Sequence, residues 1–288
     1  MIYFCADDYG LCDSSSDNII ECVQNGVLNK ISVFPNFDFK SVKKVNENVM
    51  LSLHINLVEG SCTTKDEKLD LLTDNNGVFR HSFVKLMLLS LMHPKKMEQQ
   101  LYIELKSQIL LWKQSVSKDM PIMIDSHQHT HMIPLVFKTL LKVIKDENIS
   151  IKYLRIPAEP VKPYLMTPSI YHTYSLVNII KQWLLKFLNV INKKEYKKHK
   201  IPTAYFFGIL FSGNMDKKRV KKVLPHYIKL AKKHNCDIEV LFHPGYCNNT
   251  CQYQGMKFND FYFSKGRKTE FDTLMSMDIE SITERRAF

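Results

Sequence analysis

Two adjacent aspartates and a group of histidines are the residues through which this 288-residue chain could do chemistry. Asp7 and Asp8 directly follow a short apolar run at residues 2–6. Neighbouring carboxylates repel each other, so a fold that keeps them together places a cation or a strong base beside them. Carboxylate and imidazole groups together suit Zn²⁺ or another divalent ion. The pattern indicates a metal-dependent hydrolase, whose site could be completed by His54, His127, His129, His131 and His243.

The histidines at 127, 129 and 131 alternate with other residues, so in an extended segment they would share one side. A metal shell does not need all three of them. We expect one or two to hydrogen-bond the substrate or to orient the ligands.

The elements that position these side chains alternate between strand and helix. The strand-like runs are mostly apolar throughout, which is typical of parallel strands covered on both faces. They lie at residues 2–6, 31–34, 50–57, 121–125, 151–156, 204–211 and 238–242. Helical stretches are expected at about 15–26, 83–92, 95–117, 134–147, 174–192 and 215–235. This order predicts an α/β protein, a (β/α) barrel of about seven parallel strands with its site at their carboxyl ends.

The composition of the chain indicates the number of domains and the cellular compartment. With 45% hydrophobic residues and no linker rich in Pro, Gly or Ser, residues 1–288 are expected to form one domain, with a lid or insertion at 160–202. The seven cysteines are odd in number and unpatterned, which fits a reducing compartment. The apolar start is too short for a secretory signal, and we expect a cytoplasmic protein.

Positive charge follows an apolar stretch in the second half of the chain. The net charge is +11, and a lysine cluster at 193–200 comes directly after the apolar residues 174–192. Such a helix is either a lid packed on the barrel with solvated lysines, or an interfacial helix that touches an anionic membrane or a lipid-linked substrate. No nucleic-acid motif with interleaved aromatic residues accompanies the basic runs, so we expect no nucleic-acid partner.

Five segments, in this order along the chain, resemble motifs of the YdjC family of carbohydrate deacetylases. They are residues 6–11 (Ala-Asp-Asp-Tyr-Gly-Leu), 53–60 (Leu-His-Ile-Asn-Leu-Val-Glu-Gly), 125–134 (Asp-Ser-His-Gln-His-Thr-His-Met-Ile-Pro), 154–159 (Leu-Arg-Ile-Pro-Ala-Glu) and 242–245 (Phe-His-Pro-Gly). The resemblance extends from residue 1 to about 275. It implies a deformed (β/α) barrel that removes acetyl groups from N-acetylated sugars, and a homodimer would be in keeping with it.

The resemblance also implies roles for individual residues. It makes Asp8, His54 and His127 the ligands of one divalent ion, Zn²⁺ or Mg²⁺, with Asp7 as the general base and His243 as the acid. Arg155 either keeps Asp7 ionised or forms a salt bridge that closes the barrel. The residues expected to bind substrate are Asn56, His129 and His131.

Two other functions remain as alternatives at this point. An amidohydrolase- or phosphoesterase-type barrel also carries paired histidines at a strand end, but usually on its first strand. A metal-bound protein that only binds a glycan or lipid headgroup would need neither a base nor an acid. The chain also shows no apolar final strand after residue 275, so the barrel is expected to be open at its seam.

Overall fold

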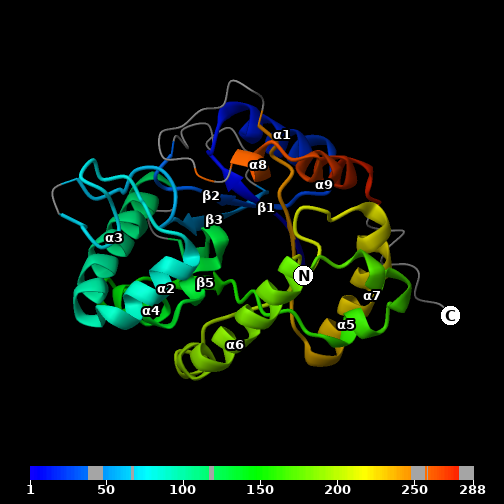
Figure 1. Cartoon of the computed structure of the whole chain (residues 1–288). Coiled ribbons are helices and arrows are strands. Elements are labelled where there is room, and N and C mark those ends of the chain that lie inside the picture. The colour runs from blue at the N-terminus through cyan, green and yellow to red at the C-terminus, as the bar shows by residue number, and fades with distance from the viewer. Residues whose placement is uncertain (38–47, 66–67, 117–119, 248–256, 258, 279–288) are drawn as a thin grey trace.

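One parallel sheet of seven strands forms the centre of the molecule (Figure 1). The computed structural model describes residues 1–37, 48–65, 68–116, 120–247, 257 and 259–278. The strand order is β5-β4-β3-β2-β1-β7-β6, and every neighbouring pair is parallel. The strands are β1 (Ile2–Tyr9), β2 (Lys30–Val33), β3 (Met50–Ile55), β4 (Ile122–Ser126), β5 (Ile151–Leu154), β6 (Tyr205–Phe207) and β7 (Ile238–Phe242).

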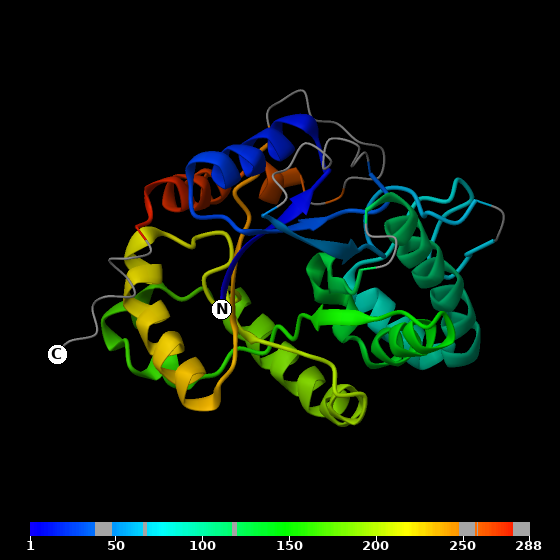
Figure 2. The same ribbon diagram turned by 180° about the vertical axis from the view of Figure 1, so that it is seen from behind.

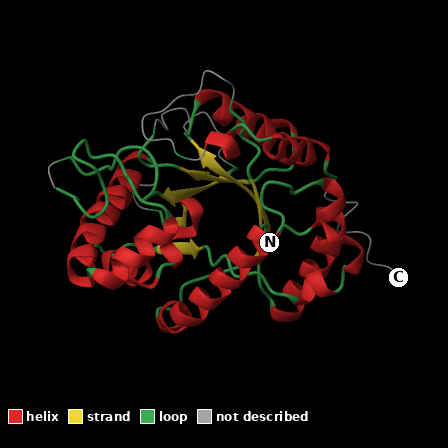
Figure 3. Ribbon diagram, viewed as in Figure 1, coloured by secondary structure: helices red, strands yellow, loops and turns green. Residues whose placement is uncertain are grey.

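Helices form an outer layer around the curved sheet (Figure 3). Parallel strands need a crossover between successive members, and described helices supply it from β1 to β2 and for each step from β3 onwards. The α-helices are α1 (Asp13–Asn25), α2 (Phe83–Met92), α3 (Pro94–Ser115), α4 (Pro134–Asp146), α5 (Lys162–Leu165), α6 (Leu176–Lys198), α7 (Lys217–His234), α8 (Asn259–Tyr262) and α9 (Lys265–Ser276). Two 3₁₀ segments, η2 (His127–Met132) and η3 (Pro168–Thr173), complete the described elements. Among the residues described, none of the helices is both long and apolar enough to span a bilayer.

The barrel is open between β5 and β6, which are the two edges of the sheet. Seen from behind, the segment between these strands runs along the open side (Figure 2). The N–H of Leu154, the last residue of β5, donates at 3.0 Å to the carbonyl of Pro202, which precedes β6. At the carboxyl end, buried Glu159 accepts the backbone N–H groups of Ile209 and Leu210 at 2.8 and 3.2 Å. Hydrogen bonds therefore hold the two edges where strand pairing is missing. The predicted (β/α) barrel of about seven parallel strands, open at a seam, is confirmed and has the form of a half-barrel.

Most predicted elements agree with the structure to within three residues at each end, and two differ by more. The strand expected at 204–211 ends at Phe207, because the next backbone N–H groups turn towards Glu159 instead of a neighbouring strand. The helix expected at 174–192 runs to Lys198 and includes most of the lysine cluster. The single-domain boundaries and the lid role of residues 160–202 stay predictions.

Candidate metal centre and active site

A bulge at the end of β1 aims the two adjacent aspartates at different partners. Ala6 pairs with Ile31 and Tyr9 with Val33, so β1 has one residue more than β2 between these two pairs. Asp8 takes a left-handed backbone conformation with φ 70°. Such a conformation is uncommon for a residue other than glycine and occurs at sites that the surrounding structure holds in place. β-Bulges are frequent beside active sites, where they redirect a side chain.

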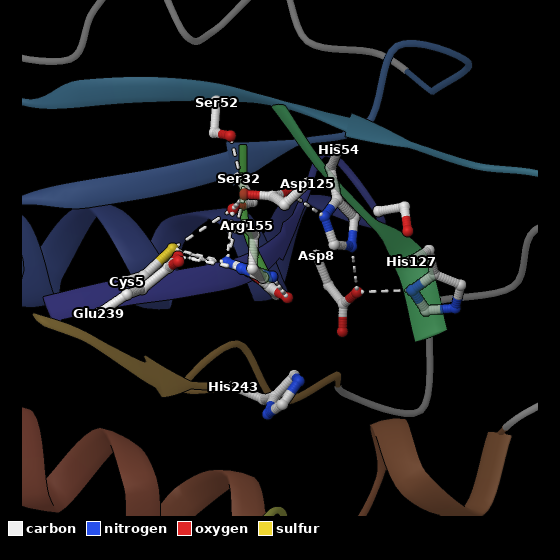
Figure 4. A network of polar contacts seen from close by, with 12 residues as sticks. Cys5, Asp8, Ser32, Ser52, His54, Asp125, His127, Arg155, Glu239 and His243 are labelled. Carbon is white, nitrogen blue, oxygen red and sulfur yellow. Dashed lines mark hydrogen bonds and ion pairs between the residues drawn. The ribbon is translucent and has the colours of Figure 1, made fainter. Parts of the chain in front are cut away.

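Asp8 lies in a cluster with two histidines (Figure 4). Its Oδ1 atom is 3.0 Å from His127 Nδ1 and 3.5 Å from His54 Nε2. His54 comes from the end of β3, and His127 is the first residue of η2, directly after β4. One ligand atom from each of the three residues lies within 4.8 Å of the others, and all three residues are buried. The structure therefore brings together the three residues expected to bind an ion.

His54 is oriented by a carboxylate on the neighbouring strand. Asp125 is its register partner on β4, and Asp125 Oδ1 is 2.6 Å from His54 Nδ1. Although burial lowers it, Asp7, Asp125 and Asp8 together raise the pKa of His54 to about 9. His54 Nε2 has no hydrogen-bond partner and is turned towards Asp8. In metal-binding histidines, a carboxylate usually pairs with one ring nitrogen in this way and so orients the other nitrogen towards the metal.

These observations fit a divalent ion. A buried imidazole nitrogen without a partner, a second imidazole and a carboxylate converge on one small region. Three protein ligands leave positions for water and substrate, as in catalytic zinc sites. A second group of potential ligands (Cys5, Asp7, Asp125) is different, because the Arg155 guanidinium already contacts all three of its members. We therefore assign the metal centre to the Asp8 group alone.

Asp7 is held in a two-point ion pair with Arg155. The two guanidinium nitrogens donate to the two carboxylate oxygens at 2.7 and 2.8 Å, and both side chains are buried. Burial raises the pKa of Asp7, but the positive charge of Arg155 outweighs this effect, and the pKa falls from 3.8 to about 2. Asp7 is therefore ionised at every pH near neutrality.

Arg155 belongs to a charged network that fills the inside of the half-barrel. It reaches from the end of β5 across the barrel and also donates to Glu239 on β7, at 2.7 Å from Nη2. Lys30 on β2 donates to Glu239 at 2.7 Å and to Asp125 at 3.1 Å. All of these side chains are fully buried. Arg155 therefore makes both contacts that were predicted as alternatives: it pairs with Asp7, and it forms a salt bridge across the barrel with Glu239.

His243 follows β7 and is paired with a glutamate of α9. Its Nδ1 atom is 3.5 Å from Glu270 Oε2, and its backbone N–H donates to the same oxygen. The His243 ring lies edge-on to Phe261 at 5.3 Å between ring centroids. In Figure 4 the imidazole lies on the other side of Asp8 from His54 and His127. The Asp7 carboxylate and the His243 imidazole thus both lie outside the three-residue cluster.

The same face of α9 also holds Asp8. Arg267, one turn before Glu270, donates to Asp8 Oδ2 and to the Gly245 carbonyl, and its guanidinium lies against the rings of Phe261 and Tyr262. Burial raises the pKa of Asp8, but Arg267, His127 and His54 lower it well below 3.8. One helix thus positions both a candidate ligand and the candidate acid.

The expected arrangement of the histidine triplet is wrong. Gln128 and His129 have φ values of 51° and 57°, so the segment turns back on itself and is not extended. His127 alone reaches Asp8. The His129 ring packs against Phe206 at 5.7 Å, with its Nδ1 lacking a hydrogen-bond partner. Burial and the charge of Arg155 lower the pKa of His129 well below 6.5, so it is neutral.

His131 and Asn56 have their polar groups engaged within the protein. His131 Nδ1 is 2.5 Å from Ser126 Oγ and its Nε2 is 2.8 Å from the Arg155 carbonyl. The Asn56 carboxamide accepts from the Val58 N–H at 3.0 Å and donates to the Glu59 carbonyl at 2.7 Å. These contacts fix Arg155 and the loop after β3. Substrate binding by His129, His131 and Asn56 stays a prediction, and His129 is the member with an unpaired nitrogen.

Sequence reasoning missed several polar side chains of the site. Asp125 was visible within the resembling segment 125–134, but its role beside His54 depends on the strand register. Glu239 lies inside a strand that is otherwise apolar, which indicates a buried charge that needs a partner, whereas Lys30 directly precedes the strand expected at 31–34. Arg267 and Glu270 are three residues apart, which places them on one face of a helix. Nothing in the sequence indicates that this face lies beside Asp8.

The fold and the cluster at its carboxyl edge define an α/β half-barrel protein with a candidate divalent-metal centre. The family model described as YdjC-like protein matches residues 1–285, and the chain belongs to this family. It is 27% identical over 160 residues to a protein named carbohydrate deacetylase from Danio rerio, covering 54% of this chain and 49% of that protein. A carbohydrate deacetylase of Thermoanaerobacter pseudethanolicus is 25% identical over 54% of this chain and 61% of its own length. The matches to these two relatives thus span about half to three fifths of their length.

Two further comparisons cover nearly the whole chain. A protein named carbohydrate deacetylase from Xenopus laevis is 23% identical over 96% of this chain and 91% of its own length. A crystal structure of an Enterococcus faecalis V583 protein named for cellobiose-phosphate cleavage superimposes with a TM-score of 0.69 at 16% identity, over 99% of this chain and 94% of that one. The structural likeness establishes the shared fold.

Proposed function

We propose that this chain is a metal-dependent deacetylase of N-acetylated sugars. The observation that carries the proposal is an ionised carboxylate, Asp7, directly beside the cluster of Asp8, His54 and His127. A protein that only binds a metal or a glycan does not need a base, whereas hydrolysis needs one, and Arg155 keeps Asp7 ionised for this role. The names of the relatives support the same substrate class.

Asp8, His54 and His127 would hold the divalent ion, which when bound supplies Lewis acidity to the acetyl carbonyl and to the attacking water. Two imidazoles among three ligands favour zinc, whereas a carboxylate with several waters also suits magnesium. Arg267 and Asp125 keep Asp8 and His54 in position for this purpose.

Asp7 takes the proton from the attacking water. Its two-point ion pair with Arg155 fixes the carboxylate in place and keeps it charged, so that it is in the correct protonation state before substrate binds. A positioned base of this kind contributes about 10²- to 10⁴-fold to the rate.

His243 donates a proton to the departing sugar amine. An amine leaves an amide poorly unless it is protonated, so the reaction needs an acid as well as a base. Glu270 Oε2 lies 3.5 Å from His243 Nδ1 and helps to hold the imidazole in place. Phe261 covers one edge of the ring and limits its orientations.

The test is metal-dependent release of acetate from N-acetylglucosamine oligomers. The purified chain is stripped with a chelator and then supplied with Zn²⁺ or Mg²⁺ alone, and acetate and bound metal are both measured. We expect activity to disappear with the metal and return with one of the two ions, while Asp7→Asn binds the ion without releasing acetate. Stoichiometric binding of the ion with no acetate from any N-acetylated saccharide would favour a binding protein and contradict the proposal.

The cytoplasmic location and the homodimer stay predictions. They do not enter the proposed reaction, because each residue given a role comes from one chain.

A further inference from the structure

Helix α6 turns its apolar side away from the protein. Six large side chains that recur every three or four residues share this side, and each is 46–73% exposed. They are Leu176, Ile180, Trp183, Phe187, Val190 and Ile191. We call this surface the outer α6 face. Figure 1 shows α6 at the edge of the molecule, between α4 and the α5–α7 pair. Contiguous exposed apolar surface of this kind marks an interaction site.

The opposite side of α6 carries buried amides that fix the helix in this orientation. Asn192 Nδ2 donates to the Met132 carbonyl at 2.8 Å, and Gln182 Nε2 donates to the Glu159 carbonyl at 3.1 Å. Asn178 Nδ2 lies 3.3 Å from the Leu210 carbonyl and 3.2 Å from the Ser212 carbonyl. Rotating α6 to bury its apolar residues would break these bonds and leave buried polar groups unpaired, which is costly. The exposure of the outer α6 face is therefore built into the fold.

Positive charge continues the outer α6 face towards the end of the helix. Lys194 and Lys198 follow Val190 at intervals of four residues, so they lie on the same side, and both are exposed. The one acidic residue of α6 is Glu195. Lys186 lies 5.2 Å from the Trp183 ring, at the border of the apolar surface. Apolar residues with a central tryptophan and flanking lysines match the interface of an anionic bilayer.

The beginning of α6 also borders a cavity that has the Phe261 ring in its wall. This cavity of about 340 Å³ is lined by Val177, Phe211 and Phe261, among other residues. Phe261 is the ring that lies edge-on to His243. An acyl or prenyl chain that enters this cavity beside the outer α6 face would contact Phe261, the ring that packs against the candidate proton donor.

From these observations we propose that the outer α6 face docks the protein on an anionic lipid surface. Membrane docking would bring a lipid-linked N-acetylated sugar to the site, and this substrate assignment rests on the proposed function. The docking itself needs no activity. The two ideas can therefore fail separately.

Co-sedimentation of the full chain with vesicles tests the docking. We expect binding to vesicles of phosphatidylcholine mixed with phosphatidylglycerol at physiological ionic strength, and little binding to phosphatidylcholine alone. Replacing Lys194 and Lys198 by Gln should weaken binding about 25-fold, since each lysine near an anionic surface contributes about fivefold. The double variant Ile180→Ser/Phe187→Ser should also lose most of the binding.

Matched controls come from the rest of the molecule. Val84 and Leu91 on α2 are 54% and 74% exposed, so Val84→Ser/Leu91→Ser removes a similar amount of exposed apolar surface elsewhere and should leave vesicle binding unchanged. Trp183 is exposed and Trp112, the other tryptophan, is buried, so a blue shift of the emission on adding anionic vesicles reports on the outer α6 face. This shift should be absent from Trp183→Phe, which still co-sediments.

Four results would contradict the docking or the substrate assignment. Failure to bind either type of vesicle, or equal binding by the α6 double variant and the wild type, would overturn the docking. A dimer in sedimentation velocity that Phe187→Ser abolishes, without vesicle binding, would assign the outer α6 face to a second copy and also overturn it. Vesicle binding without acetate release from a lipid-linked N-acetylated sugar would support the docking and contradict the substrate assignment.

Discussion

Substitution of Asp7 by Asn separates the base from the metal ligands. The two residues Asp7 and Asp8 are adjacent in sequence, but the bulge in β1 gives them different partners. Asn has nearly the same shape as Asp, and it removes the negative charge that faces Arg155. Asp8, His54 and His127 keep their positions, because none of their contacts passes through the Asp7 carboxylate.

The Asp7→Asn substitution should lower both kcat/KM and the free energy of unfolding. Loss of a general base should lower kcat/KM by about 10²- to 10⁴-fold. The pKa of Asp7 falls from 3.8 to about 2 on folding, which corresponds to about 2 kcal/mol of stability at neutral pH, since one pKa unit is worth about 1.4 kcal/mol. The side chain is buried, so solvent does not screen its pairing with Arg155. The Asp7→Asn substitution should therefore reduce the free energy of unfolding by about 2 kcal/mol at pH 7.

The stability effect has a definite pH dependence. A carboxyl group whose pKa is lowered by folding contributes its full stability above the unfolded pKa of 3.8 and loses it as the pH falls towards 2. The difference in unfolding free energy between the wild type and Asp7→Asn should be constant above about pH 5 and should narrow below about pH 4. Acetate release should be low in the variant at every pH.

Three measurements on the same preparation check this reasoning. Urea denaturation at several pH values gives the stability difference, acetate release gives kcat/KM, and elemental analysis gives the bound metal. We expect full metal occupancy with a large loss of activity. Loss of the ion from Asp7→Asn together with its retention by Asp8→Asn would exchange the two roles, and a stability difference that does not narrow in acid would refute the ion-pair explanation.

The remaining predictions concern the metal ligands, the acid and the seam. Ala at Asp8, His54 or His127 should abolish stoichiometric metal binding with the fold retained by circular dichroism, and full occupancy in all three variants would contradict the assignment. Glu270→Gln removes the charge beside the candidate acid and should lower kcat about tenfold, as expected from replacing a charge-assisted contact by a neutral one, with metal content unchanged; an unchanged kcat would remove Glu270 from the reaction. Glu159→Gln weakens the hydrogen bonds across the seam and should cost about 1–3 kcal/mol in urea denaturation, whereas an unaltered midpoint would mean that the seam is held elsewhere.

Local patterns in the sequence were sufficient for much of the fold. Buried parallel strands appear as short apolar runs because both of their faces are covered, and this predicted all seven strands. An open barrel was also predicted, from the lack of an apolar strand after residue 275, but the opening lies between β5 and β6, because β7 pairs directly with β1. The length of β6 was not predictable in this way, because it depends on Glu159, a residue distant in sequence that takes the N–H groups after Phe207.

The sequence by itself also determined which residue types gather at the carboxyl edge of the sheet. Each candidate side chain lies at or just after the end of a strand, and parallel strands end at the same edge. Only the tertiary structure decided how they are used. The bulge in β1 gives Asp7 and Asp8 different partners, and the turn in η2 leaves His127 as the one histidine of the triplet that contacts Asp8. Helix α9 brings Arg267 and Glu270 to the site, although both lie more than two hundred residues after Asp8 in the sequence. Strand position follows from local hydrophobicity, whereas the direction of a side chain and the partner of a buried charge depend on contacts between distant segments, which no local pattern encodes.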